Sequence, residues 1–247
     1  LASEMRKNPM TIEDVFRVSS KAPLFNIIIL QDRLAQLMWR KERDLHIRGN
    51  LVWVNGERDT RVKFVESPNG RFFMRILMQN DAQNLHRPIN KHKFVIGCDP
   101  YEHKNALRPS DGASYGFKKF DPNDQEFSNS AIFEYCARPS PNVFFEDHIK
   151  ACVYFGAQIL VENNRIGMIN YFLDRGYGDF LIWFQGATNP GIFAGDKSKQ
   201  LAAEYIDDYV NNYAHKIFFP KLIEDMIGFD ISDSTKFDRT MAFGWTL

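Results

Sequence analysis

The sequence has little of what marks several common protein classes. Its three cysteines, Cys98, Cys136 and Cys152, are far apart and form no Cys-x-x-Cys pair among the 247 residues. This odd, dispersed set argues against a disulfide framework and a cysteine-based zinc site, and it fits a reducing cytosol. The longest apolar runs, such as 180–184, and shorter ones, such as 27–30, fall far short of the ~20 residues that a membrane span needs. We therefore expect no membrane partner.

The chain also has no net charge, because 31 Lys and Arg balance 31 Asp and Glu. Residues 1–98 carry 17 of the basic and 10 of the acidic residues, while residues 99–247 carry the other 14 and 21. The two parts therefore have charges of opposite sign, which indicates nucleic-acid contact by the first part or an ordinary solvated surface. The acidic part is where a site for divalent cations is expected.

Two further absences concern the ends of the chain and the chemistry of nucleotides. The sequence opens on Leu1 with neither an initiator methionine nor a secretory leader, so we expect a piece of a longer protein. It contains no G-x-x-x-x-G-K-[ST] phosphate loop, since residues 195–198 lack the spacing glycine. ATP hydrolysis is therefore not expected.

What is present begins with a helical pattern and a small β meander. Apolar residues recur at helical spacing over 24–45, and β-rich runs follow at 51–54, 61–65 and 72–78. Asn55-Gly56 and Asn69-Gly70 favour tight turns between these runs. Polar residues at 79–92 are typical of a linker. We predict that residues 1–92 form a basic connector with a helix and an antiparallel β extension.

From residue 93 the pattern becomes α/β. Strands are predicted at 94–98, 113–120 and 131–137, too closely spaced for crossover helices and hence antiparallel. A helix at 144–155, a strand at 159–161, a helix at 165–174 and a strand at 180–184 follow, before helices at 197–214, 220–227 and 238–247. This order predicts a second unit, 93–247, with a mixed five-stranded sheet flanked by helices.

Three carboxylates lie at predicted strand ends and at the start of a helix, where α/β proteins commonly place catalytic groups. Asp99 and Glu162 each follow a predicted strand, so neighbouring strands would place them at one edge. Asp238, at the start of the last helix, is the third candidate, although an acidic first turn also suits the helix dipole alone. Acids this close repel unless a cation binds, and hard oxygen ligands suit Mg²⁺ or Mn²⁺. Two such ions could drive phosphodiester hydrolysis.

Seven stretches in sequence order then resemble one known family. None is specific alone, but together they span residue 94 to the C-terminus and follow the order and spacing of the nuclease domain of tailed-phage terminase large subunits. They are 95–100 (VIGCDP), 110–114 (SDGAS), Glu134-Tyr135, 154–164 (YFGAQILVENN), Arg175-Gly176-Tyr177, 191–199 (a G-x-x-x-x-x-x-x-K pattern) and Phe237-Asp238-Arg239.

The resemblance implies a ribonuclease H-like fold with Asp99, Glu162 and Asp238 as metal-binding catalytic acids. It also implies a further acid near the metals at Asp111, whose alternative interpretation is a turn residue beside Gly112. The family cuts concatemeric double-stranded DNA in the host cytoplasm. Its partners would be the terminase ATPase domain, the small terminase subunit and the portal protein. Many members carry His-Asp-Asp before the last aspartate, and the run Thr-Lys-Phe at 235–237 departs from that pattern.

Several basic residues are candidates for contact with DNA phosphates. Some alternate on the strands of the predicted meander, where charged residues also commonly protect a sheet edge. Others lie around the acids or before the last helix. The candidates are Arg61, Lys63, Arg71, Lys104, Lys197, Lys199, Lys236 and Arg239.

The sequence thus favours a metal-dependent endodeoxyribonuclease that uses two Mg²⁺ or Mn²⁺ ions and a water nucleophile, with Asp99 bridging the ions. Two alternatives stay open at this point. One is a junction resolvase or transposase of the same fold. The other is a non-catalytic module that binds DNA or docks parts of a packaging motor, in which the acids would be structural.

Overall fold

A computed structural model of the chain describes residues 23–41, 45–78, 83–101 and 111–247. Their strands form one seven-stranded mixed sheet in the order β2-β1-β3-β6-β5-β4-β7. The strands are β1 (Ile47–Trp53), β2 (Val62–Glu66), β3 (Phe72–Met74), β4 (Phe94–Asp99), β5 (Gly112–Lys118), β6 (Ser130–Ala137) and β7 (Gln158–Val161). All neighbours are antiparallel except β4 and β7, which run parallel. The α/β class expected from the sequence is confirmed.

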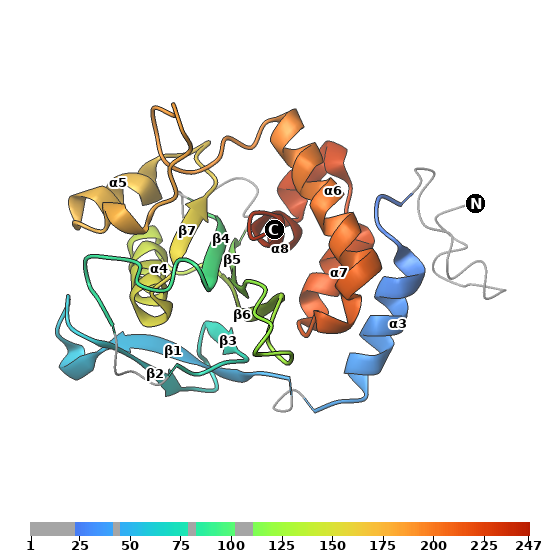
Figure 1. Cartoon of the computed structure of the whole chain (residues 1–247), viewed down its shortest axis with the longest axis horizontal. Coiled ribbons are helices and arrows are strands. Elements are labelled where there is room, and N and C mark those ends of the chain that lie inside the picture. The colour runs from blue at the N-terminus through green and yellow to red at the C-terminus, as the bar shows by residue number, and fades with distance from the viewer. Residues whose placement is uncertain (1–22, 42–44, 79–82, 102–110) are drawn as a thin grey trace.

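Helices cover both faces of this sheet (Figure 1). They are α3 (Ile27–Met38), α4 (Pro141–Phe155), α5 (Gly167–Asp174), α6 (Asp196–Tyr213), α7 (Pro220–Gly228) and α8 (Asp238–Gly244). Short 3-10 turns are η2 (Val54–Gly56), η3 (Gly178–Phe180), η4 (Ala214–Lys216) and η5 (Ile231–Lys236). No helix among the described ranges is both long and apolar enough to cross a bilayer.

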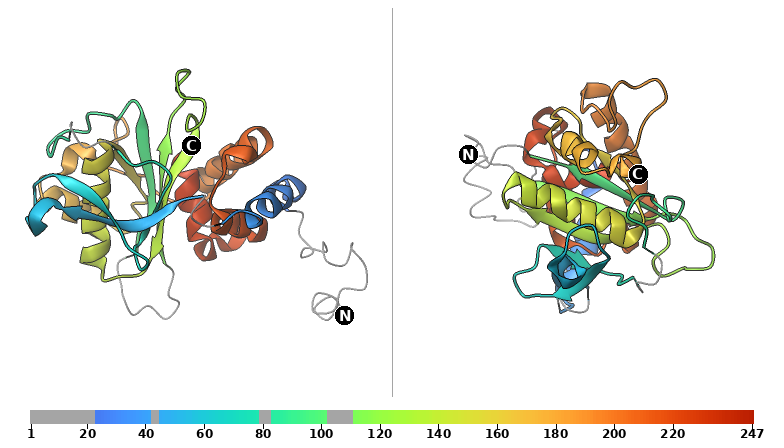
Figure 2. Two further views of the ribbon diagram at one scale, coloured as in Figure 1. Left: turned by 90° about the horizontal axis from the view of Figure 1, so that it is seen from below. Right: turned by 90° about the vertical axis from the view of Figure 1, so that its left-hand side faces the viewer.

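The core lies in two layers, one on each side of the sheet. The first joins β1, β3 and β6 to α4 and α5 through side chains such as Phe72, Phe133 and Phe155. The second joins β5 to α3, α6, α7 and α8 through side chains such as Tyr115 and Phe243. The left view of Figure 2 shows the yellow helix α4 on one side of the strands and the blue and red helices on the other.

The meander and the α/β part share their sheet. Strand β3 pairs with β6, with Phe72 opposite Tyr135 and Met74 opposite Phe133. The expected β extension is therefore antiparallel as predicted, but it prolongs the main sheet and brings the total to seven strands. The predicted helix 24–45 is shorter than expected, since α3 ends at Met38.

One predicted strand is wrong. Residues 180–184 are a 3-10 turn followed by a single bridge between Leu181 and Ile159. Phe180 and Leu181 are buried, but Trp183 and Phe184 are about half exposed because the chain turns away from the sheet there. The apolar run is thus a buried loop start, which an apolar pattern alone does not distinguish from a strand.

Candidate functional site

Asp99 and Glu162 lie on neighbouring strands. Asp99 ends β4, and Glu162 directly follows β7, which is parallel to β4. The backbone N–H of Glu162 donates to the carbonyl of Cys98 at 2.9 Å, so the two acids leave the sheet at adjacent positions. The sequence-based expectation that both would lie at one edge of the sheet is confirmed.

Helix α8 brings Asp238 to the same edge. The helix lies directly on β4 at Gly97, where an added Cβ would be 2.4 Å from the carbonyl oxygen of Ala242. Only a glycine permits this approach of helix and strand. Asp238 occupies the first turn of α8, as the sequence predicts.

The N-terminus of α8 is held by a neighbouring helix. Phe237 at the N-cap has no side chain that could accept a hydrogen bond from the first turn. Asp225 of α7 supplies the missing acceptor. Its Oδ2 accepts from the backbone N–H of Thr240 at 2.9 Å and from the Thr240 hydroxyl at 2.8 Å. A side-chain acceptor at the third helical position is what an N-cap supplies. Asp225 therefore fixes the turn that carries Asp238.

The electrostatics connect Asp99 to both of the other acids. Burial raises the pKa of Asp99 well above its usual value, and the charges of Glu162 and Asp238 raise it further. Asp99 keeps some contact with solvent, although protein surrounds its carboxyl closely. Burial also raises the pKa of Asp238 to about 7, aided by the charges of Asp225 and Asp111.

Asp111 lies beside Asp238. It is exposed, and its backbone N–H donates to the Asp238 carboxylate, which partly offsets the rise in the pKa of Asp238. The structure thus brings Asp111, Asp238, Asp99 and Glu162 into one neighbourhood. Mutual repulsion in a partly buried place is the state that a bound cation relieves.

Two basic side chains reach the same acids. Lys199, in the first turn of α6, lowers the pKa of both Asp99 and Glu162, and Arg165 does so as well. Lys199 was predicted as a phosphate contact, whereas Arg165 was missed. The available signal was its place three residues after Glu162, in the loop that follows β7.

The loop after β7 positions Lys199. Asn164 Oδ1 accepts from the backbone N–H of Ala194 at 2.7 Å, and Asn163 Nδ2 donates to Pro190 O at 3.0 Å. Gly191 has a φ of +86°, and an added Cβ there would be 2.3 Å from Val161 O. These contacts tie the segment leading into α6 to the end of β7, so the glycine of the 191–199 stretch is structural.

Trp245 was not among the candidate site residues predicted from the sequence. Its indole Nε1 is buried without an acceptor of full hydrogen-bond geometry in the described part of the chain. It nevertheless lies close enough to Glu162 to lower the pKa of that carboxyl. A buried N–H directed toward an acid favours the charged carboxylate.

The other basic residues predicted to contact DNA lie at different distances from the acids. Lys197 is exposed at the start of α6, and Lys236 is exposed and paired with Asp233. Arg61 and Lys63 are exposed at the edge strand β2, which is five strand spacings from β4, or ~24 Å at the usual spacing. Lys104 falls outside the described residues.

Two predicted DNA contacts have internal partners. Arg71 Nε donates to Asp147 Oδ2 at 2.7 Å, and Asp147 is almost fully buried. Arg239 Nε lies 3.8 Å from the buried carboxylate of Glu134, which also accepts from the Tyr115 hydroxyl. Both guanidinium groups compensate buried acids, and both side chains stay partly exposed, so their contact with DNA phosphates stays a prediction.

The donor chemistry suits a hard divalent cation. The four acids offer carboxylate oxygens, which Mg²⁺ and Mn²⁺ prefer, and their repulsion disfavours the cation-free state. Within the described ranges, however, no three His, Cys, Asp or Glu side chains lie close enough together to form a ready-made metal cage. The residues fit a metal by type and charge.

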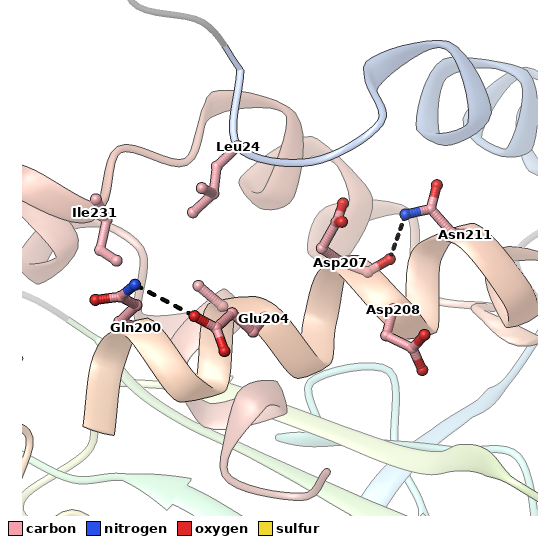
Figure 3. A pocket seen from close by; sticks show the side chains of 8 residues that line it. Leu24, Gln200, Glu204, Asp207, Asp208, Asn211 and Ile231 are labelled. Atoms are coloured by element: carbon pink, nitrogen blue, oxygen red, sulfur yellow. Dashed lines mark hydrogen bonds between the residues drawn. The ribbon is translucent and has the colours of Figure 1, made fainter. Parts of the chain in front are cut away.

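A described cavity lies away from these acids. It has a volume of about 370 Å³ and is bounded by the exposed face of α6, with Glu204, Asp207 and Asp208, and by Leu24 and Ile231 (Figure 3). The chemistry described above favours the acidic edge of β4 and β7 over this hollow.

Comparison with known proteins assigns the chain to no family. No protein family model matches the chain, and no curated protein matches it in sequence.

Proposed function

We propose that the chain is a metal-dependent endodeoxyribonuclease, specifically a ribonuclease H-like nuclease domain of a phage terminase large subunit that cuts double-stranded DNA. The observation that carries this proposal is the convergence of three carboxylates from separate elements. Asp99 ends β4 and Glu162 follows the adjacent parallel strand β7, and Asp238 comes from helix α8, which packs on β4 and β5. The strand order β6-β5-β4-β7, with β4 and β7 parallel, is compatible with that fold.

Each residue has a proposed part. Asp99, Glu162 and Asp238 would hold Mg²⁺ or Mn²⁺, with Asp111 beside them. Bound metal would supply a nucleophilic water and stabilise the leaving oxygen of the phosphodiester. Lys199 and Arg165 carry positive charge at the same edge and would attract the scissile phosphate. Arg61 and Lys63 stand at the same end of the strands and would contact phosphates further along a duplex.

The proposal is tested by cleavage of supercoiled plasmid with Mg²⁺, Mn²⁺ or EDTA. Wild type is expected to nick and linearise the plasmid only with metal, and Asp99→Asn, Glu162→Gln and Asp238→Asn are each expected to lose at least ~100-fold in rate. Asp207→Asn, a partly exposed acid on α6, is the matched control and should cut as wild type does. Equal cutting by a folded Asp99→Asn variant would refute the assignment.

The same experiment addresses the non-catalytic alternative. A folded wild-type protein that binds duplex DNA but leaves the plasmid intact under either metal would favour a docking or DNA-binding module. In that case the acids would be structural. Preference for four-way junctions over plasmid would instead favour a resolvase.

A further inference from the structure

Two arginines, one buried and one partly buried, share one phenyl ring on the face of the sheet covered by α3, α6 and α7. Arg33 of α3 and Arg75, directly after β3, have their guanidinium carbons 4.6 and 3.5 Å from the centroid of the Phe218 ring. Arg33 is only 8% exposed, and Arg75 is partly buried. Two like charges are thus held close together in a largely dehydrated place.

Their donors are not fully used. Arg33 Nε donates to Ile217 O at 2.8 Å and Nη1 to Gln36 Oε1 at 3.2 Å, but the buried Nη2 has no acceptor among the residues that the structure describes. Arg75 has a buried Nη1 in the same condition. A guanidinium group offers five N–H donors in a fixed fork, so each arginine retains unused donor capacity.

The described residues also supply no counter-ion for these two charges. Neither Arg33 nor Arg75 forms an ion pair with an acid in the described parts of the chain. Burial lowers the pKa of Arg75 to about 10, and the nearby charges of Arg33 and Arg40 lower it further, against the opposing charge of Glu126. The Phe218 ring face offsets part of the cost through cation–π attraction. A buried cation without a counter-ion remains unfavourable.

A cavity opens beside Arg33. It has a volume of about 300 Å³ and lies between α3 and the end of α6. Its polar lining is mostly neutral or basic, and the lining contains one carboxylate, Asp32. The polar residues are Arg33, Gln36, Asn211, Asn212, His215 and Asp32.

We infer that this cavity binds a phosphate-type oxyanion, held by Arg33 and favoured by the second positive charge of Arg75. Tetrahedral oxyanions match the planar donor fork of arginine, which binds phosphate through two parallel hydrogen bonds. The ligand is either free inorganic phosphate or a phosphodiester group of duplex DNA, because both present the same oxygens.

The site is separate from the acidic edge. Strand β3 runs opposite to β4, so Arg75 lies at the end of the sheet where β4 begins, whereas Asp99 lies where β4 ends. Three strand spacings and the length of β4 separate them by roughly 20 Å. The inference therefore does not depend on the proposed nuclease activity.

The test is an NMR titration of the whole chain with inorganic phosphate at constant ionic strength, with chloride as the reference anion. The Nε–H resonances of Arg33 and Arg75 are expected to shift in a saturable way. Arg87, an exposed arginine in another loop, should not respond beyond the chloride reference. This readout needs no variant, so it stands even if substitution of Arg33 disturbs folding.

Variants then assign the contact. Arg33→Gln is expected to weaken phosphate binding at least ~10-fold, whereas Arg87→Gln, which removes the same charge elsewhere, should leave it unchanged. A short blunt duplex that displaces phosphate would identify the DNA backbone as the source, and failure to displace it would identify free phosphate. Absence of a saturable shift at Arg33, or equal binding by a folded Arg33→Gln variant, would overturn the inference.

Discussion

At the scale of single residues, His148 shows how burial fixes a charge state. It lies fully buried in α4, with Nδ1 2.7 Å from Phe144 O and Nε2 2.7 Å from the Ser114 hydroxyl. Since a carbonyl oxygen only accepts, Nδ1 must carry the proton and Nε2 accepts from Ser114. Burial lowers the pKa of His148 to about 4, so the ring is neutral at ordinary pH.

This depressed pKa predicts a loss of stability in acid. Between the ordinary pKa of 6.5 and the folded value of about 4, the unfolded chain takes up a proton that the folded chain does not. The free energy of unfolding should therefore fall with falling pH across this window, by roughly 3 kcal/mol from this residue. Urea unfolding between pH 7 and 4.5 checks it, with His148→Gln as the reference. Parallel pH profiles of the two proteins would contradict the assignment.

The positions of the candidate acids could be predicted from the sequence, because each lies at the end of a strand or the start of a helix that the local pattern locates. Asp99 and Glu162 follow strands that the pattern locates, and Asp238 follows from the start of a helix. Arg71 was not predictable in the same way, because its partner Asp147 lies 76 residues further along the chain. Pairings at that separation depend on how helices and strands pack together. Sequence pattern does not encode that packing.

At the scale of elements, the contact of α8 with β4 decides whether Asp238 reaches the other acids. The contact depends on Gly97, because a side chain there would collide with the backbone of α8 at Ala242. The sequence pattern predicted both β4 and α8, but it did not predict that the helix lies so close to the strand. It likewise assigned an extra strand to 180–184, where burial is real but strand pairing is limited to Leu181.

Gly97→Ala is therefore expected to destabilise the protein by about 1–3 kcal/mol through overpacking. It should also lower metal-dependent cleavage, because α8 must move away from the sheet and take Asp238 with it. Thermal unfolding and plasmid cleavage measure the two effects. Gly228→Ala at the end of α7, where the nearest atom is 3.4 Å from the added Cβ, is the control. If both variants were equally stable and active, the contact would have no part in placing Asp238.

At the scale of the whole molecule, the meander is tied to the rest by a polar network as well as by the sheet. Glu146 of α4 accepts from Trp53 Nε1 at 2.7 Å and from the Tyr171 hydroxyl at 2.7 Å, and it pairs with Arg175. Arg175 in turn donates to Asp59 at 2.6 Å. One carboxylate therefore joins β1, α4 and α5.

The network predicts that meander and core unfold together. Tryptophan fluorescence and far-UV circular dichroism should give the same urea midpoint, since both report one cooperative unit. Glu146→Ala should lower the free energy of unfolding by roughly 3 kcal/mol, because Arg175 loses its buried partner. Glu204→Ala, an exposed acid on α6, should have little effect. Separate transitions in wild type would show that residues 1–92 form an independent unit.

We propose that Asp99, Glu162 and Asp238 together hold a divalent cation. The most direct test is anomalous X-ray diffraction from crystals of the whole chain soaked in Mn²⁺. We expect anomalous density between these three carboxylates in wild type and none there in Asp99→Asn. Manganese bound only elsewhere, such as beside Asp207 and Asp208, or none bound at these acids at saturating concentration, would contradict it.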